Sequence, residues 1–239
     1  MTVSEMHSAV RLGLDKTSSF EYASFLTEEL DFWLNEAQER FVKQRLYGNN
    51  YKQEKYDQSQ KRIDDLRTLI RQSGNLTLNS SYLGSNIKEA VLPVNLSDGP
   101  YMFYLNSSVK DGVNNELQTG DSIPVELLSR YTKDVVNNPY IMRPLVYLYN
   151  AYSSFYTAYV DMIAIIYGDE FVPTTCNVLY VRKPKKLVSG TPGSYETNTC
   201  ELPEHTHREI VTMCVEMLIE NIESPRVQTY SQINASKSE

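Results

Sequence analysis

The chain has 239 residues, with 23 Lys and Arg against 30 Asp and Glu, and a formal net charge of −7 at pH 7. This length allows one large domain or two small ones without disulfide support. The negative charge argues against a general nucleic-acid binder, because affinity for phosphate backbones comes chiefly from clustered Lys and Arg. The cysteines number 3, an odd count that indicates reduced thiols rather than a secreted disulfide framework.

No basic and apolar leader opens the chain, and no apolar run approaches the ~20 residues needed to cross a bilayer. We therefore expect a soluble protein with no membrane segment. The 18 tyrosines are unusual for this length. Each combines a large apolar ring with a polar tip, which suits half-exposed sheets and subunit contacts better than deep cores.

The segment Ser4 to Asp15 is predicted to form a first short helix, with Met6, Val10 and Leu14 on one side. The clearest helix of the chain follows, from Thr27 to Tyr47. Thr27 is a good N-cap, and glutamates occupy the first turn, where the helix dipole favours negative charge. The next helix is predicted within Asp57 to Gln72.

The helix 27–47 has two apolar stripes. The first is the core-facing pattern of an amphipathic helix and comprises Leu30, Leu34, Ala37 and Phe41. The second comprises Phe32, Val42 and Leu46 and projects to another side. A monomer would leave that side in water, so we interpret the second stripe either as a subunit interface or as a face packed under a loop of the same chain.

Short alternating runs broken by Asn, Ser and Gly indicate a β region from Ser73 to Gly120. A helix is predicted over 124–136. Beyond it, Leu145 to Tyr149 and Phe155 to Tyr167 read as a hairpin, and Cys176 to Arg182 as a third strand, which makes an antiparallel meander the economical topology. The loop 183–199 is expected to project.

A long, mostly apolar helix is predicted from Glu201 to about Glu223, and such a helix is buried by more than one neighbour. The fold class is therefore α+β: an N-terminal helical part, a central antiparallel β-sheet or meander insertion, and a long C-terminal helix with an extended tail. The predicted domains are a helical body (1–72 with 201–223), a β-rich domain (73–200) that includes the helix 124–136, and the tail 224–239. The tail carries Tyr230 and Ile233, which we expect to contact neighbouring subunits.

Chemistry-bearing residues are sparse. His205 and His207 are two apart on a predicted helix and do not face one way, so they do not form the i, i+4 pair of a helical metal site. Neither these histidines nor His7 offers a Cys–His or Ser–His–Asp arrangement. We predict no catalytic residues, no metal and no cofactor.

One basic run stands out in this acidic chain, and it comprises Arg182, Lys183, Lys185 and Lys186. A solvated strand end that resists edge pairing accounts for it, since Lys serves that purpose routinely. The alternative is contact with an acidic partner or with DNA in a channel.

Three blocks together resemble the head-to-tail connector ring proteins of tailed bacteriophages, most closely those of crAss-like phages. They are LTEELDFWLNEAQERFVKQRLYG, NNPYIMRPLVYLYN and ELPEHTHREIVTMCVEMLIENIESPRVQ. The resemblance covers nearly the whole chain, but it rests on ordered blocks and overall layout rather than on a catalytic signature.

This resemblance implies a structural virion protein in the phage neck, synthesised in the host cytoplasm. About twelve copies would form a ring that closes through one repeated interface. The implied partners are further copies, the portal protein, adjacent ring or tail proteins, and double-stranded DNA that passes through the channel without sequence recognition. The main alternative is a monomeric, Tyr-rich β-domain that binds a host receptor or glycan, and an enzyme ranks last.

Overall fold

The computed structural model describes residues 1–17, 25–47, 60–81, 84–92, 100–112, 117–124, 126, 144–153, 158–168 and 171–221. Several sequence predictions fall outside these residues. They are the helix 124–136 except for Pro124 and Glu126, the tail 224–239, and the interface candidates Tyr230 and Ile233 within it. Among the described residues, no helix is long and apolar enough to cross a membrane.

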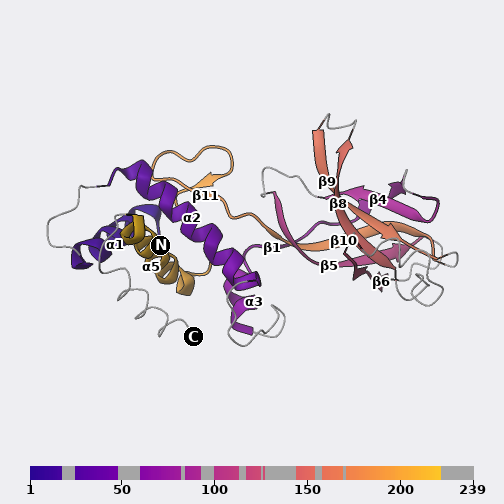
Figure 1. Ribbon diagram of the computed structural model, residues 1–239, viewed down its shortest axis with the longest axis horizontal. Coiled ribbons are helices and arrows are strands. Elements are labelled where there is room, and N and C mark those ends of the chain that lie inside the picture. The colour runs from indigo at the N-terminus through magenta and orange to yellow at the C-terminus, as the bar shows by residue number, and fades with distance from the viewer. Residues whose placement is uncertain are drawn as a thin grey trace. The chain divides into compact units, whose positions relative to one another are not determined.

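Helices and strands both contribute to the chain, which confirms the α+β class (Figure 1). The helices are α1 (Val3–Thr17), α2 (Thr27–Tyr47), α3 (Gln60–Leu66), the 3-10 helix η3 (Glu204–Thr206) and α5 (His207–Asn221). The strands of the N-terminal half are β1 (Ile70–Gln72), β2 (Leu76–Thr77), β3 (Asn79–Ser80), β4 (Ile87–Val91), β5 (Tyr101–Asp111), β6 (Leu117–Thr119) and β7 (Asp121–Ser122). Those that follow are β8 (Leu145–Ser153), β9 (Ala158–Ile166), β10 (Pro173–Arg182), β11 (Lys186–Leu187) and β12 (Glu196–Thr197).

The described residues divide into two units. The helical unit contains those of 1–69 and 183–221, and the β unit contains those of 70–92 and 100–182. The chain enters the β unit at β1 and leaves it at the end of β10, and these two strands pair antiparallel with Ile70 opposite Val181. The segment 183–200, predicted as part of the β-rich domain, belongs to the helical unit instead.

In the helical unit, α5 contacts both α1 and α2 (Figure 1). The predicted core stripe of α2 is confirmed, because Leu30, Leu34, Ala37 and Phe41 have no exposed surface. On α5, the face that contains Ile210, Cys214 and Leu218 is fully buried. Contacts with two helices explain why the sequence of α5 is apolar over such a wide arc.

The third predicted helix ends earlier than its periodicity indicated. Helix α3 stops at Leu66, a turn closes with the amide of Leu69 donating to the Leu66 carbonyl at 2.9 Å, and Ile70–Gln72 forms strand β1. Pairing with β10 overrides the local helical pattern here, since β-branched Ile70 lies opposite β-branched Val181.

The β unit contains two sheets. One has the order β1-β10-β5-β6, with β2 also pairing with β10, and the other has the order β3-β4-β9-β8-β7. A core cluster draws residues from both sheets, including Val109 and Val178 of the first and Val146 and Ile163 of the second. A second cluster, with Tyr147 and other residues at intervening positions, covers the opposite face of the second sheet. Burial on both faces explains the nearly continuous apolar sequence of β8 and β9.

The predicted hairpin is confirmed by the antiparallel pairing of β8 with β9. The predicted meander is wrong, because β10 pairs with β5 in the other sheet. Strand β4, a weak signal in the sequence, pairs with the free edge of β9. With both edges of β9 occupied, the following strand crosses to the opposite sheet, where Cys176, Val178 and Tyr180 face the shared core.

Candidate functional site

The return segment, residues 183–189, lies along α2 and is held there by a side-chain amide. Asn35 Nδ2 donates to the Leu187 carbonyl at 2.9 Å, and the Leu187 amide donates to Asn35 Oδ1 at 2.8 Å. On its other edge, β11 runs parallel to β12, and the amides of Lys186 and Val188 donate to the carbonyls of Tyr195 and Thr197. Asn35 thus pairs with β11 as the peptide group of another strand would.

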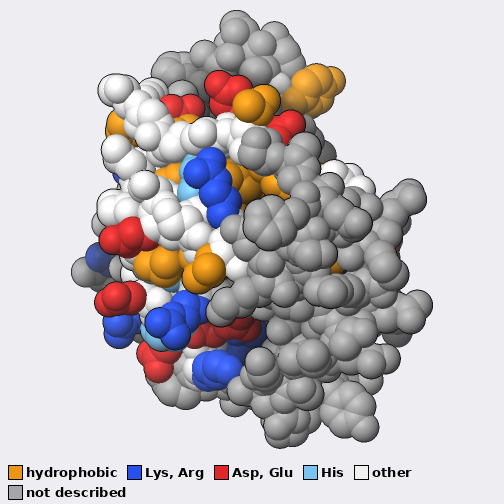
Figure 2. All heavy atoms as spheres, turned by 90° about the vertical axis from the view of Figure 1, so that its left-hand side faces the viewer, with side chains coloured by type: hydrophobic (Ala, Val, Ile, Leu, Met, Phe, Trp, Pro, Cys, Tyr) orange, Lys and Arg blue, Asp and Glu red, His pale blue; other side chains and the backbone are white. Residues whose placement is uncertain are grey.

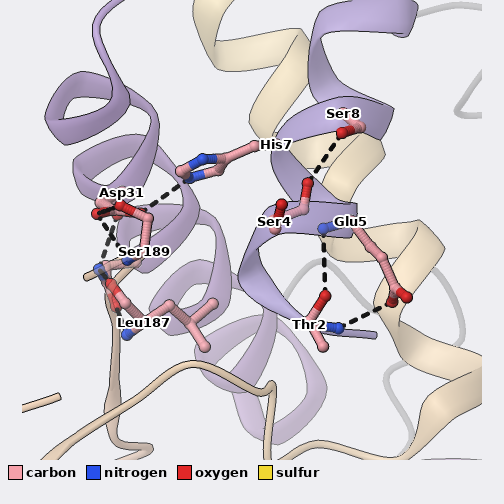
Figure 3. A network of polar contacts seen from close by, with 9 residues as sticks. Thr2, Ser4, Glu5, His7, Ser8, Asp31, Leu187 and Ser189 are labelled. Atoms are coloured by element: carbon pink, nitrogen blue, oxygen red, sulfur yellow. Dashed lines mark hydrogen bonds and ion pairs between the residues drawn. The ribbon is translucent and has the colours of Figure 1, made fainter. Parts of the chain in front are cut away.

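Residues one turn to either side of Asn35 extend this contact. Gln38 Nε2 donates to the Lys185 carbonyl at 3.2 Å, and both the amide and hydroxyl of Ser189 donate to Asp31 Oδ2 at 3.1 Å. The other carboxylate oxygen of Asp31 lies 2.8 Å from Nε2 of the buried His7 (Figure 3). Three elements, α1, α2 and the return segment, therefore converge on one carboxylate.

This constellation contains Ser, His and Asp without the geometry of a nucleophilic triad. The hydroxyl of Ser189 contacts the carboxylate of Asp31, not the imidazole of His7 (Figure 3). A triad needs the imidazole next to the hydroxyl, where it can accept the proton. The arrangement is suited to fastening the return segment.

The predicted loop 183–199 is therefore docked along much of its length rather than projecting, and its longest exposed run is residues 189–194. Tyr195, whose backbone adopts a positive φ of 69°, donates its hydroxyl hydrogen to the Lys183 carbonyl. Sequence reasoning missed this docking. The signal was the spacing of Asp31, Asn35 and Gln38, a polar i, i+4, i+7 row beside the apolar stripe of α2.

The second stripe of α2 is divided between core and solvent. Val42 is fully buried and Leu46 is 6% exposed, whereas Phe32 is 58% exposed. Val42 and Leu46 are thus wrong as predicted subunit contacts. Successive helix residues turn by about 100°, so Val42 and Leu46 continue the row that contains Asn35 and Gln38. That side is covered within the chain itself, the second of the two alternatives drawn from the sequence.

Phe32 is one of three exposed large apolar residues described in the helical unit, the others being Leu12 and Leu26. Its ring meets that of Trp33 edge to face, with centroids 5.5 Å apart. In the β unit the exposed large apolar residues are Tyr159, Val172 and Leu179.

The basic run is largely engaged within the chain. Lys183 Nζ lies 2.5 Å from Glu39 Oε1, and Lys185 Nζ lies 3.6 Å from Glu201 Oε1. Partial burial raises the pKa of Glu39, but the contacts with Lys183 and Lys43 outweigh it and hold that pKa below its usual value. Arg182 is 3% exposed, so it is wrong as a predicted DNA contact. Lys186 is exposed.

A chain of charges, Glu209–Arg45–Asp65–His205, joins α5, α2, α3 and η3. Arg45 Nε lies 2.7 Å from Asp65 Oδ2, and Arg45 Nη2 lies 2.5 Å from Glu209 Oε1. His205 Nε2 lies 2.7 Å from the other oxygen of Asp65. Because Asp65 is 1% exposed, its charge depends on these two cationic or proton-donating partners.

The two neighbouring histidines have different partners. His207 Nε2 donates to the Leu202 carbonyl at 2.7 Å, which leaves Nδ1 to accept from the Met1 amino group at 2.8 Å. Burial lowers the pKa of His207, the hydrogen bond to Leu202 opposes this, and the Met1 ammonium lowers it further, so that the imidazole is held neutral.

An open pocket of about 690 Å³ lies beside His205 and is a second candidate site. Its lining among the described residues consists of Met1, Arg67, Pro203, Glu204, His205 and Arg208.

The three cysteines are free and buried. Burial raises the pKa of Cys176 and Cys214 to about 12 and that of Cys200 to about 11. The thiolate is the nucleophilic form, so these groups are inert near neutral pH.

No family model matches the chain, and no curated protein matches it.

Proposed function

We propose that the protein is a structural subunit of an oligomeric ring in the neck of a tailed bacteriophage. In this proposal the ring joins the portal and capsid to the tail and surrounds the DNA channel. The sequence blocks quoted above support the proposal through their resemblance to connector proteins. The partners are other copies of the chain, the portal protein and an adjacent ring or tail protein.

Phe32 is the observation that carries the proposal. An aromatic side chain that remains 58% exposed on an otherwise well-packed helix is suited to fill a pocket on a neighbour. In a ring, each subunit makes the same heterologous contact with the next subunit around the axis. One exposed aromatic residue per subunit can therefore take part in every contact of the ring. The helix is well anchored on its other sides, because α5 and the return segment cover them.

The net charge of the chain is consistent with DNA that passes through the ring without binding tightly to it. The net charge is −7, and two lysines of the basic run are paired with carboxylates of the same chain. A subunit with a net negative charge gives the duplex no strong electrostatic attachment.

Incorporation into particles tests the proposal. A tagged Phe32→Asp variant is supplied during infection alongside the natural chain, and purified particles are analysed by mass spectrometry. We expect the variant to retain the circular dichroism of the parent and to be absent from particles. Arg40→Asp is the matched control, since it also places a carboxylate at an exposed position of α2 but removes no apolar ring.

Equal incorporation of the Phe32→Asp variant and the tagged parent would remove Phe32 from the interface. Absence of the tagged parent from particles would refute the virion assignment itself. Loss of both Phe32→Asp and Arg40→Asp would point to a general charge effect rather than a specific aromatic contact.

A second proposal, a monomeric binding module, rests on Tyr159, which is 73% exposed on β9. Exposed aromatic rings stack on sugar faces and on receptor side chains. A stable monomer that binds a glycan array, and loses binding on Tyr159→Ala, would favour this function over the ring.

A further inference from the structure

The pocket beside His205 brings basic groups together on an acidic protein. Arg67 follows the end of α3, His205 lies in η3, and Arg208 lies in the first turn of α5. On the face that Figure 2 presents, Lys and Arg side chains lie next to histidine, with Asp and Glu side chains among them. Segments distant in sequence therefore place cationic groups around one opening of about 690 Å³.

Neither guanidinium group is neutralised by the part of the chain that the structure describes. No described carboxylate lies within ion-pair distance of Arg67 or Arg208, although each is exposed on a molecule with 30 acidic residues. Other basic residues nearby are paired, as Arg45 is with Asp65 and Glu209. Glu204 is the one described carboxylate of the lining, so the two positive charges of the arginines exceed its single negative charge.

The buried side chain of Asp65 holds the His205 ring in position. The buried carboxylate of Asp65 accepts from Nε2 at 2.7 Å, and Asp65 is itself fixed by Arg45. With Nε2 committed to Asp65, Nδ1 is the nitrogen left for a ligand, and a proton placed there turns it into a donor.

We propose that this pocket binds the phosphate group of a small phosphate monoester. Two guanidinium forks and an imidazole, supplied by the end of α3 and by the continuous stretch of η3 and α5, match a tetrahedral group with several acceptor oxygens better than a planar carboxylate with two. The pocket is larger than one phosphate group, which leaves space for the organic part of the ligand. This inference does not depend on the ring function, because it concerns the helical unit of a single chain.

Histidine ring NMR of the intact chain provides the test. The chain has 3 histidines, so the spectrum has few ring signals, and a His205→Gln variant assigns that of His205. Titration with inorganic phosphate and with ribose 5-phosphate should shift the His205 signal saturably while the signal of His7 stays in place. His7 lies outside the pocket lining, against Asp31, and so reports on non-specific effects.

Affinity for ribose 5-phosphate should fall about tenfold or more in Arg67→Gln and in Arg208→Gln, the loss expected for one charge-assisted hydrogen bond. Arg11→Gln is the matched control, an exposed arginine of α1 in the same unit but outside the lining. It should bind as the parent does. The tryptophan fluorescence melting curve verifies that each variant is folded.

Three results would overturn the proposal. They are no saturable shift of the His205 signal with either phosphate compound, an equal loss of affinity in Arg11→Gln, and saturation by an acidic peptide or short duplex DNA but not by ribose 5-phosphate. The last result would assign the pocket to a macromolecular partner instead.

Discussion

Replacement of Asn35 by alanine should loosen the return segment from α2 and destabilise the helical unit. The Asn35 amide makes two hydrogen bonds to the backbone of Leu187, at 2.8 and 2.9 Å, and Leu187 has no exposed surface. Asn35→Ala therefore leaves a buried amide and a buried carbonyl without partners. Each such group costs about 1–3 kcal/mol, so we expect a loss of about 2–6 kcal/mol for the two together. That is a large share of the roughly 5–15 kcal/mol that stabilises a domain.

Urea unfolding followed by tryptophan fluorescence measures this loss, because the only tryptophan of the chain, Trp33, lies on α2. Hydrogen exchange at the Leu187 amide should accelerate in parallel. Glu36→Ala is the matched control, since Glu36 neighbours Asn35 on α2 but is exposed. A difference between the two variants below about 0.5 kcal/mol, the lower limit for a single net hydrogen bond, would refute the view that Asn35 fastens the segment.

Three further changes probe the same unit. Arg45→Met leaves the buried Asp65 carboxylate with only one ionic partner, and urea unfolding should show a loss of about 3 kcal/mol in unfolding free energy. A loss no larger than that of a substitution at an exposed position would contradict a stabilising role for the chain of charges. Leu46→Ala should cost about 2–5 kcal/mol as a core truncation, whereas unchanged stability with impaired assembly would restore Leu46 to an interface. The pKa of His207 is lowered on folding, so the folded chain binds fewer protons, and stability should decrease as pH falls below about 6.5, the ordinary histidine pKa, towards the folded value. His207→Gln should flatten this part of the curve of unfolding free energy against pH, and an unaltered curve would contradict the assignment.

Local signals predicted the long elements of this fold well. Helix α2 begins at Thr27 and ends at Tyr47 as its cap and period indicate, and the C-terminal helix and the β8–β9 hairpin are confirmed. These elements share strong periodicity or strong β propensity over many residues, and such segments retain their local preference in the folded chain.

Tertiary pairing decided the rest. Ile70 continues a helical period, yet pairs with Val181, and β10 leaves the meander because β4 has already paired with β9. Neither outcome has a local signal, since each depends on residues far apart in the chain. The interface prediction failed at Val42 and Leu46 for a related reason. A second apolar stripe on a helix indicates a second contact, but not whether that contact belongs to a neighbour or to the same chain.

Of the candidate sites, the sequence identified Phe32 but missed both the docking of the return segment on Asn35 and the pocket beside His205. Asn35 is one asparagine among many in the sequence, and its role depends on the approach of β11 from a point more than half the chain away. Arg67 and Arg208 likewise have no motif in common. Their proximity comes from the packing of α3 and α5 around the charges of Arg45 and Asp65.

Electron cryomicroscopy of the particle neck tests the central claim most directly. We predict a ring of repeated copies of this chain around the DNA channel, with Phe32 buried against the adjacent copy or an adjoining ring. A particle whose neck contains no copies of the chain, or a ring in which Phe32 faces solvent, would contradict it.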